Sequence, residues 1–500
     1  MTHRIAGAPL DFAALRSELE VPGDFDSAVL ADAEHAAASV RLPDPDATDI
    51  PFVTIDPAGS RDLDQALHIA RDGDGFVVSY AIADVASFVV PGSALDAETH
   101  RRGETLYFPD VRVPLHPPGL SEAAASLLPG QIRPAVLWRI TLDATGEVAA
   151  VDVGRARVRS TAQLDYAGVQ RSFDAGTPPA SVEALVDVGT RRLALARARH
   201  AIDLDLPEQS VEPDGPGGWT LTLRSPLPVE RYNAEISLLT GMCAASIMLR
   251  GGFGLLRTVP PPDPGAVQAL HRAAGALGID WPEGAAPGDV LDSVDRADPR
   301  HVAFIEHAVA LLRGSGYTPF DGAPPAQARH SGIGAPYAHV TAPLRRLVDR
   351  YGSEICLALH AGTAIPDWVR RAVPALPAQM QQADHRAHLA DRAVVDATEA
   401  WLLRDRVGER FDAVVIDADE RAGTVVLDEP AVRARCTGPD LPVGERIRVR
   451  LVTADVEQRD VHFERAWPTR VSARVVVNPA RITATRADKT GQWYSCSAAG

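Results

Sequence analysis

Three aspartates, Asp56, Asp62 and Asp64, fall within nine positions of the sequence, and Gln65 follows the last of them directly. Carboxylates that are crowded together repel one another, and burial makes the repulsion worse unless a cation neutralises them. Hard divalent ions such as Mg²⁺ and Mn²⁺ prefer oxygen ligands of this kind. Such clusters commonly serve phosphoryl chemistry, in which the ions bridge the attacked phosphate. The spacing therefore makes this stretch a candidate metal site.

Two other interpretations of this acidic stretch were weighed. A solvated acidic turn is the ordinary explanation of an Asp-rich loop, and the stretch alone does not exclude it. A calcium-binding EF-hand needs oxygen ligands at alternate positions, a central glycine and a glutamate at position twelve. Here the acids stand at positions one, seven and nine and the glycine at position four, so the EF-hand is excluded.

The local geometry gives the three carboxylates a way to meet. Asp62 and Asp64 are two positions apart, so on a strand they would project from the same face. Asp56 precedes Pro57 and Gly59, which are turn residues that let the chain fold back toward the other two acids.

A second segment, residues 335–359, has the pattern of a loop that enters a helix. Thr341 can cap that helix and Pro343 suits its first turn. The helix would bury one apolar stripe, made of Leu344, Leu347, Val348, Tyr351 and Ile355.

Two arginines, Arg345 and Arg346, would lie in the first turn of this helix. The helix dipole disfavours cations there, and a bound anion would remove the conflict, because backbone N–H groups and guanidinium groups can hold it together. The alternative is a pair of surface arginines neutralised by Asp349.

The elements that must position these residues follow from the surrounding pattern. Residues 1–50 read as two short helical segments. A hairpin follows around the turn 72–75, and a second hairpin surrounds residues 144–147. The middle of the chain is helical, and a long helix is expected over 377–406. Five short strands after Gly408 suit a small OB-type barrel.

The expected fold class is therefore α+β, a mixed sheet with surrounding helices followed by a small β-barrel. We expect four parts: a helical N-terminal segment over 1–50, a catalytic domain over 51–395, a barrel with the end of its entry helix over 396–466, and a tail over 467–500.

Composition restricts the class of protein. At 46% hydrophobic and 23% charged residues, the chain of 500 residues is typical of globular protein. The cysteines are far apart and form no CxxC pair, which argues against structural zinc or a disulfide framework and favours the cytoplasm. They are Cys243, Cys356, Cys436 and Cys496. We find no signal pattern and no membrane-spanning apolar run. The formal net charge of −16 argues against a generic nucleic-acid binder.

Taken together and in order, these segments resemble the ribonuclease II (RNB) family of exoribonucleases. The family signature is an aspartate followed by three more at plus six, plus eight and plus nine, which match Asp56, Asp62, Asp64 and Gln65. Further similar segments are "YAIADV", "HRRGETLYFPDVRVPLHPPGLSEAAASLLPG", "AQLDYAGVQ", "GFGLLRTVPPPDP" and "HSGIGAPYAHVTAPLRR". The resemblance covers roughly residues 50–395.

The resemblance implies hydrolysis of single-stranded RNA from its 3′ end to nucleoside 5′-monophosphates, with Mg²⁺ as the cofactor and Mn²⁺ as the alternative. It implies that Asp62, Asp64, Arg345 and Tyr166 are catalytic, with Arg345 on the attacked phosphate and Tyr166 positioning the 3′-terminal nucleotides. The implied metal ligands are Asp56, Asp62, Asp64 and Gln65. The implied RNA-binding residues are Tyr107, Arg101, Arg102, His339, Thr341, Arg346 and Asp391, with Tyr107 stacking on a base.

The sequence also departs from the family pattern. Gln65 replaces an aspartate, Gly241 replaces a common asparagine, and Asp391 stands where glutamate is usual. About fifty upstream residues cannot hold the two cold-shock-type barrels typical of bacterial members, so we expect a trimmed form.

Three functions therefore stay open. The first is an active exoribonuclease, working as a monomer in the cytoplasm with no membrane partner. The second is a catalytically weak or inactive RNA-binding member of the same family, in which Gln65 marks the lost turnover. A third possibility is an endonuclease or a DNA-directed enzyme.

Overall fold

The computed structural model describes residues 10–466 except 205, 207, 216 and 428. Two short helices open the described chain, α1 (Phe12–Glu18) and α2 (Ser27–Ser39), as the sequence predicted. Asp11 caps α1, because its side chain accepts the N–H of Ala13 at 2.8 Å. The predicted tail, 467–500, lies outside the described residues.

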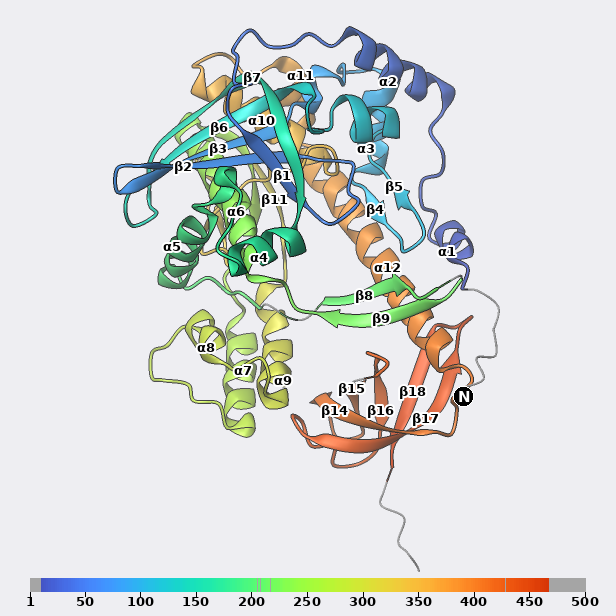
Figure 1. The fold of residues 1–500 in the computed structure, drawn as a ribbon. Helices are drawn as coiled ribbons and strands as arrows, with labels where there is room; N and C mark the ends of the chain where they lie inside the picture. The colour runs from blue at the N-terminus through green and yellow to red at the C-terminus, as the bar shows by residue number, and fades with distance from the viewer. Residues whose placement is uncertain (1–9, 205, 207, 216, 428, 467–500) are drawn as a thin grey trace, which may run out of the picture. The chain divides into compact units, whose positions relative to one another are not determined.

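A closed barrel forms the centre of the fold (Figure 1). Its strands pair in the order β1-β2-β3-β6-β7. They are β1 (Phe52–Asp56), β2 (Gln65–Asp72), β3 (Gly75–Ala83), β6 (Ile132–Leu142) and β7 (Val148–Asp165). Both predicted hairpins are present, and closure requires one parallel pairing, between β1 and β7. The expected mixed sheet therefore closes on itself.

Helices pack around this barrel and share its apolar core. Buried faces of α6 and α10 meet residues of β3 and β6 there, including Tyr80 and its cross-strand partner Trp138. The helices of this region are α3 (Ala94–Arg102), α4 (Tyr166–Asp174), α5 (Leu185–Ala198), α6 (Pro228–Gly251), α10 (Leu347–His360), α11 (Asp367–Ala372) and α12 (Leu376–Leu403).

Short hairpins and a helical group complete the chain before the last barrel. The two-stranded pairs are β4 (Leu106–Tyr107) with β5 (Arg112–Val113), β8 (Glu208–Pro213) with β9 (Trp219–Arg224), β10 (Phe253–Thr258) with β11 (Gly316–Asp321), and β12 (Arg329–His330) with β13 (Ala335–Pro336). The helical group is α7 (Pro264–Leu277), α8 (Pro287–Ser293) and α9 (Pro299–Ala308).

The expected C-terminal barrel is present and closed, with strand order β14-β15-β16-β18-β17. Its strands are β14 (Arg410–Ala418), β15 (Ala422–Leu427), β16 (Arg433–Thr437), β17 (Arg446–Asp455) and β18 (Asp460–Arg465). Its core includes Ala400 and Leu403 from the end of α12, the long helix that can be followed in Figure 1. This helix runs without a break through the domain boundary expected at 395–396.

The start of α10 corrects one sequence prediction. The helix begins at Leu347 with Arg346 as its N-cap residue, so Thr341 does not cap it and the two arginines precede its first turn. The carboxylate of Asp349 accepts the N–H of Ala342 at 2.8 Å, and Asp64 accepts the N–H of Leu344 at 2.7 Å. Residues 343–345 form a separate turn, closed by the N–H of Arg346 on the carbonyl of Ala342 at 2.9 Å. The helix starts only after Arg346, which is extended and bridges Glu104. The predicted apolar stripe is buried.

Gly241 has a steric reason to be glycine. A Cβ atom added to it would lie 2.0 Å from the ring of Tyr337 and 2.7 Å from the carbonyl oxygen of Ala338. The carbonyl of Gly241 also accepts the N–H of Ala338 at 3.1 Å, so α6 and the 337–338 segment are in direct backbone contact. An asparagine would force them apart at this point.

Across the described residues, we find no helix with both the length and the apolar character that crossing a bilayer requires.

Candidate active site

A cavity of about 930 Å³ brings together acidic, basic and aromatic side chains from distant parts of the chain. Asp56 comes from the end of β1, and Asp62 and Asp64 come from the loop that leads to β2. Arg345 comes from the loop before α10. The cavity also contains Tyr107 of β4 and Asp391 of α12. These six residues are the predicted site residues that the structure gathers.

Asp56 is placed by the closure of the central barrel. The parallel register of β1 and β7 puts Asp56 opposite Asp165, at the point where both strands end. Beyond it the chain turns sharply, with Gly59 at φ 85° and the N–H of Ser60 bonded to the carbonyl of Pro57 at 3.1 Å. The left-handed conformation at Gly59 is one that residues with a Cβ rarely adopt. The predicted turn thus returns the chain to the cavity.

Asp64 is the most deeply buried acid of the cavity, with 3% of its surface exposed. Its Oδ1 accepts the backbone N–H of Leu344 at 2.7 Å, and its Oδ2 lies 3.4 Å from Nε of Arg345. Burial raises the pKa of Asp64 to about 8, although Arg345 and the Leu344 N–H act in the opposite direction. Burial likewise raises the pKa of Asp56 to about 6, with Arg345 opposing it.

Asp62 has partners of its own on the β4–β5 hairpin. Nη1 of Arg112 lies 2.5 Å from Asp62 Oδ1, and the hydroxyl of Tyr107 lies 3.4 Å from Oδ2. Residues 61–64 precede β2, so Asp62 and Asp64 do not share a strand face as the spacing suggested. Both line the same cavity: the guanidinium of Arg112 binds Asp62, and the backbone N–H of Leu344 binds Asp64.

Gln65 lies outside this cavity. It is the first residue of β2, and both ends of its amide group are engaged. Nε2 donates to the carbonyl oxygen of Thr341 at 2.6 Å, and Oε1 accepts the hydroxyl of Tyr80 at 2.9 Å. The structure therefore places the Gln65 amide between two protein groups, and Gln65 does not line the cavity that contains the acids.

The two neighbouring arginines have different environments. The side chain of Arg345 is 49% exposed and faces the cavity. The guanidinium of Arg346 pairs with the buried carboxylate of Asp349, at 2.5 Å from Nε and 2.9 Å from Nη2. The alternative of a pair neutralised by Asp349 thus describes Arg346, whereas Arg345 lies beside Asp64 and lines the cavity.

The remaining predicted RNA-binding residues divide by exposure. Arg101 is exposed and pairs with Glu98, whereas Arg102 is buried, donates to the carbonyls of Gly23 and Pro114, and lies 3.7 Å from the ring centroid of Phe25. The guanidinium of Arg102 is therefore engaged inside the protein.

His339 and Thr341 are also engaged inside the protein. Nδ1 of His339 lies 2.8 Å from the hydroxyl of Tyr317, and Thr341 is 4% exposed. Of the predicted binding residues, Tyr107 at 48% exposure and Asp391 are the ones that face the cavity.

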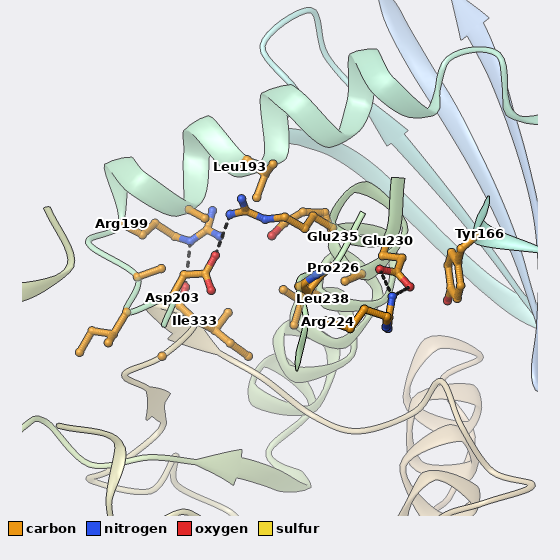
Figure 2. A pocket seen from close by; sticks show the side chains of 16 residues that line it. Tyr166, Leu193, Arg199, Asp203, Arg224, Pro226, Glu230, Glu235, Leu238 and Ile333 are labelled. Carbon is orange, nitrogen blue, oxygen red and sulfur yellow. Dashed lines mark hydrogen bonds and ion pairs between the residues drawn. The ribbon is translucent and has the colours of Figure 1, made fainter. Parts of the chain in front are cut away.

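Tyr166 follows Asp165, the residue that pairs with Asp56 across the β1–β7 ladder. It is the first residue of α4, directly after Asp165, and its hydroxyl accepts a hydrogen bond from Nδ2 of Asn233 at 3.3 Å. Its ring lines a second cavity of about 480 Å³, in which Figure 2 shows Tyr166 beside the ion pair of Arg224 and Glu230. Tyr166 thus stands close to the acids but opens toward a different space.

The carboxylates of the cavity suit a cation site that is completed by water and substrate better than a site closed by protein ligands alone. Within the described chain, no three His, Cys, Asp or Glu side chains converge closely enough to hold a metal ion. Mg²⁺ is usually held by one or two carboxylates, with water and substrate phosphate completing its shell. Asp56 and Asp64 fit that pattern, because they share the cavity and burial disfavours their charge until a cation supplies compensation.

Sequence reasoning missed two contributors to the cavity. Arg112 has no distinctive local signal, and its role depends on a fold that brings β5 to Asp62. The β8–β9 hairpin lines the cavity through Gln209, Ser210 and Val211. Its signal was available, because the turn-forming "PDGPGG" separates the alternating segments "QSVE" and "WTLTL".

Comparison with known proteins adds two family matches. The RNB domain matches residues 45–357, and the RNase II-type exonuclease C-terminal S1 domain matches residues 409–466. Among curated proteins, Exoribonuclease 2 of Edwardsiella piscicida is 29% identical over 385 residues, covering 74% of this chain and 58% of that protein. Ribonuclease R of Aquifex aeolicus is 27% identical over 460 residues, covering 82% and 63%. The chain thus spans about six tenths of the length of these relatives.

Solved structures show the same fold. Mycoplasma genitalium RNase R in complex with ribose methylated single-stranded RNA matches with a TM-score of 0.81 and 19% identity, over 91% of this chain and 77% of that one. Yeast Ssd1, described as a pseudonuclease, matches with a TM-score of 0.64 and 17% identity, over 84% and 53%.

Proposed function

This chain belongs to the RNB domain family, and on that premise we propose that it is a hydrolytic 3′-to-5′ exoribonuclease. Its substrate would be single-stranded RNA, and its products nucleoside 5′-monophosphates. The observation that carries the proposal is the meeting of Asp56, Asp64 and the half-exposed Arg345 in one cavity. Carboxylates that can hold a divalent cation, beside a guanidinium that can bind phosphate, are one arrangement that catalyses phosphodiester hydrolysis. The names of the relatives, exoribonuclease and ribonuclease, support the same reaction.

The residues of this chain would share the reaction as follows. Asp56 and Asp64 would hold a divalent cation, Mg²⁺ or Mn²⁺, which when bound neutralises phosphate charge and activates water. Arg345 would donate to the nonbridging oxygens of the attacked phosphate. Asp62, fixed by Arg112, would orient the water from the hairpin side. A divalent cation at Asp56 and Asp64 would also explain why two carboxylates with raised pKa values line the same cavity.

Two tyrosines would hold the RNA on either side of the acids. The exposed ring of Tyr107 offers a face for a base within the larger cavity. The ring of Tyr166 stands next to Asp56 at the start of α4 and would position the 3′-terminal nucleotide. Stacking on aromatic rings binds single strands with little sequence preference. This arrangement supports a substrate that is threaded by its end.

A degradation assay tests the proposal. Purified protein is incubated with 5′-labelled oligo(A) and with Mg²⁺ or Mn²⁺, and the Asp64→Asn variant, prepared identically, controls for contaminating nucleases. We expect a ladder that shortens from the 3′ end, with nucleoside 5′-monophosphate as the released product. A circular RNA and a DNA strand should both persist. Cleavage of the circle would indicate an endonuclease, and loss of the DNA strand a broader nuclease.

A second candidate function is RNA binding without turnover. Two observations favour it: Gln65 bonds to Tyr80 and Thr341 instead of supplying a carboxylate, and no three acids converge on one point in the described residues. The same assay separates the two functions, because a binding protein would shift the labelled oligo(A) in a gel and leave its length unchanged at every metal concentration.

We also propose roles for the domains of the chain, its cellular location and its oligomeric state. We propose that residues 51–395 carry the chemistry, that 396–466 add an RNA-binding barrel, and that the protein works in the cytoplasm as a monomer. Size-exclusion chromatography with light scattering, with and without oligo(A), tests the last point, and a dimeric mass would contradict it.

A further inference from the structure

The side-chain amide of Gln65 connects two separate parts of the protein next to the candidate active site. Nε2 lies 2.6 Å from the carbonyl oxygen of Thr341, and Oε1 lies 2.9 Å from the hydroxyl of Tyr80. A carbonyl oxygen can only accept, so the amide must present its N–H to Thr341. That choice turns Oε1 toward Tyr80, which must then donate. The orientation of the amide is therefore fixed by its partners.

Tyr80 cannot change its role in this network. Its side chain is 1% exposed, and a buried hydroxyl without a partner is costly. The other bond of the hydroxyl is to Oγ of Ser237 on α6, at 2.9 Å. Because Tyr80 donates to Gln65, Ser237 must donate to Tyr80. A chain of three bonds thus runs from α6 through β3 and β2 to Thr341.

Thr341 begins the loop that presents Arg345. Asp64, the neighbour of Gln65, holds the same loop, because its Oδ1 accepts the N–H of Leu344 at 2.7 Å. The carbonyl of Arg345 is fixed by the N–H of Thr105 at 2.9 Å. Gln65 and Asp64 therefore hold successive points of one loop, and the guanidinium that leaves this loop lies 3.4 Å from Asp64.

A carboxylate at position 65 could not make these contacts. It has no N–H for the carbonyl of Thr341, and at 2.6 Å two acceptor oxygens would repel each other. It would also add a negative charge directly beside Asp64, which is already buried. An aspartate would in addition be one methylene too short to span Thr341 and Tyr80.

We propose that Gln65 is a positioning residue, which sets the place of Arg345 against Asp64 by tying the 341–346 loop to Tyr80. The proposal rests on the proposed exoribonuclease function and replaces the expectation that Gln65 is a weak metal ligand. It follows that an acid at this position lowers turnover and gives no gain in metal affinity.

Steady-state kinetics on oligo(A) test the proposal with two variants. Gln65→Glu keeps the length of the side chain but loses the N–H donor. Gln65→Asn keeps a neutral amide on a side chain that is one methylene shorter. We expect each to lower kcat at least about tenfold, with KM raised by a smaller factor and an unaltered or higher half-saturating Mg²⁺ concentration. Gln131→Glu and Gln131→Asn, at an exposed glutamine, are the matched controls and should behave as wild type. A lower half-saturating Mg²⁺ concentration in Gln65→Glu would overturn the proposal.

A double-mutant cycle with Arg345→Ala separates positioning from a general loss of structure. If Gln65 acts through Arg345, Gln65→Asn should lower kcat less than about threefold once Arg345 is alanine. An equal factor in both backgrounds would overturn the proposal. Tyr80→Phe, which removes only the hydroxyl, should lower kcat in the same direction by a smaller factor. Thermal unfolding of each variant shows whether it is folded.

The same cycle can be measured without catalysis. Anisotropy of labelled oligo(A) in EDTA should show weaker binding for Gln65→Asn and for Arg345→Ala, and no further loss in the double variant. If the wild type hydrolyses no RNA with either metal, the proposed function fails, and this binding cycle still decides the role of Gln65. Wild-type affinity in Gln65→Asn, or full additivity with Arg345→Ala, would overturn the positioning role.

Discussion

Nε of Arg345 lies 3.4 Å from Oδ2 of Asp64, while Oδ1 of the same carboxylate accepts the N–H of Leu344 at 2.7 Å. One carboxylate therefore orients both the backbone that carries the arginine and the guanidinium itself. Because Asp64 is almost fully buried, its charge depends on Arg345 and on whatever cation enters the cavity.

Asp64→Asn should abolish hydrolysis while leaving RNA binding within about twofold of wild type. The lost carboxylate acts on water and cation, for which a decrease of about 10²–10⁴ in rate is typical, whereas RNA is held by stacking and by phosphate contacts elsewhere. Single-turnover degradation and anisotropy with oligo(A) give the two values. Asp74→Asn, in the exposed β2–β3 turn, is the matched control. Near wild-type degradation by Asp64→Asn would remove this residue from the chemistry.

The stability of the protein in EDTA should depend on pH through Asp64. The pKa of this carboxyl is about 8 in the folded protein, against about 4 in an unfolded chain. Between these values the folded state binds the extra proton, so its stability falls as pH rises from 4 to 8. Asp64→Asn should thus unfold at a higher temperature than wild type above about pH 6.

The difference between the two proteins should disappear near pH 4, where the carboxyl is protonated in both states. Added Mg²⁺ should raise the unfolding temperature of the wild type and leave that of Asp64→Asn nearly unchanged. Differential scanning fluorimetry from pH 4 to pH 9 measures both effects. A difference that does not vary with pH would show that Asp64 is charged in the folded protein throughout this range.

Arg345→Lys should behave almost like Arg345→Ala. An ammonium group is a point charge and cannot reproduce the planar fork of donors that grips a phosphate. Losing one such donor costs on the order of 10²–10³ in kcat. Arg139→Lys, at an exposed arginine of β6 that does not line the cavity, controls for the substitution itself. A fully active Arg345→Lys would mean that Arg345 serves only to balance Asp64.

Tyr107→Ala should weaken binding of oligo(A) by about 1–3 kcal/mol, the usual value of one base stacked on an aromatic ring. Tyr107→Phe keeps the ring and loses only the long 3.4 Å contact of the hydroxyl with Asp62, so its affinity should stay close to wild type. Fluorescence anisotropy with oligomers of increasing length measures both variants. Equal affinities of the alanine and phenylalanine variants would exclude stacking at this position.

Local patterns predicted the elements that neighbouring residues determine. The β2–β3 hairpin follows from the turn at residues 72–75, and the five strands of the last barrel follow from their short, regularly spaced apolar segments. The apolar stripe on α10 could be predicted because helical spacing is read from residues that are close together in the sequence. By contrast, the closure of the central barrel depends on β1 meeting β7, about a hundred residues later, and no local signal specifies that pairing.

The candidate active site shows the same difference between features set by neighbouring residues and features set by distant ones. The acidic residues and Arg345 were found by type and spacing, with the family resemblance joining them. The start of α10 was predicted wrongly because Arg346 is extended and bridges Glu104, a residue far earlier in the chain. The role of Gln65 was also inaccessible, since it depends on Tyr80 and Thr341, which meet it only in the folded chain. Partners distant in sequence decided each of these points.

The bond between Asp64 and Leu344 has a consequence for how the protein is made. A ribosome releases the three aspartates long before it reaches Leu344 and Arg345, and the contact that joins them spans most of the chain. Contacts of such long range form late and slowly in folding. A nascent chain shorter than about 345 residues thus carries an acidic loop without its guanidinium. Under the proposed function, such a fragment would lack the arginine that binds the attacked phosphate, so full activity would arise only after most of the chain has been made.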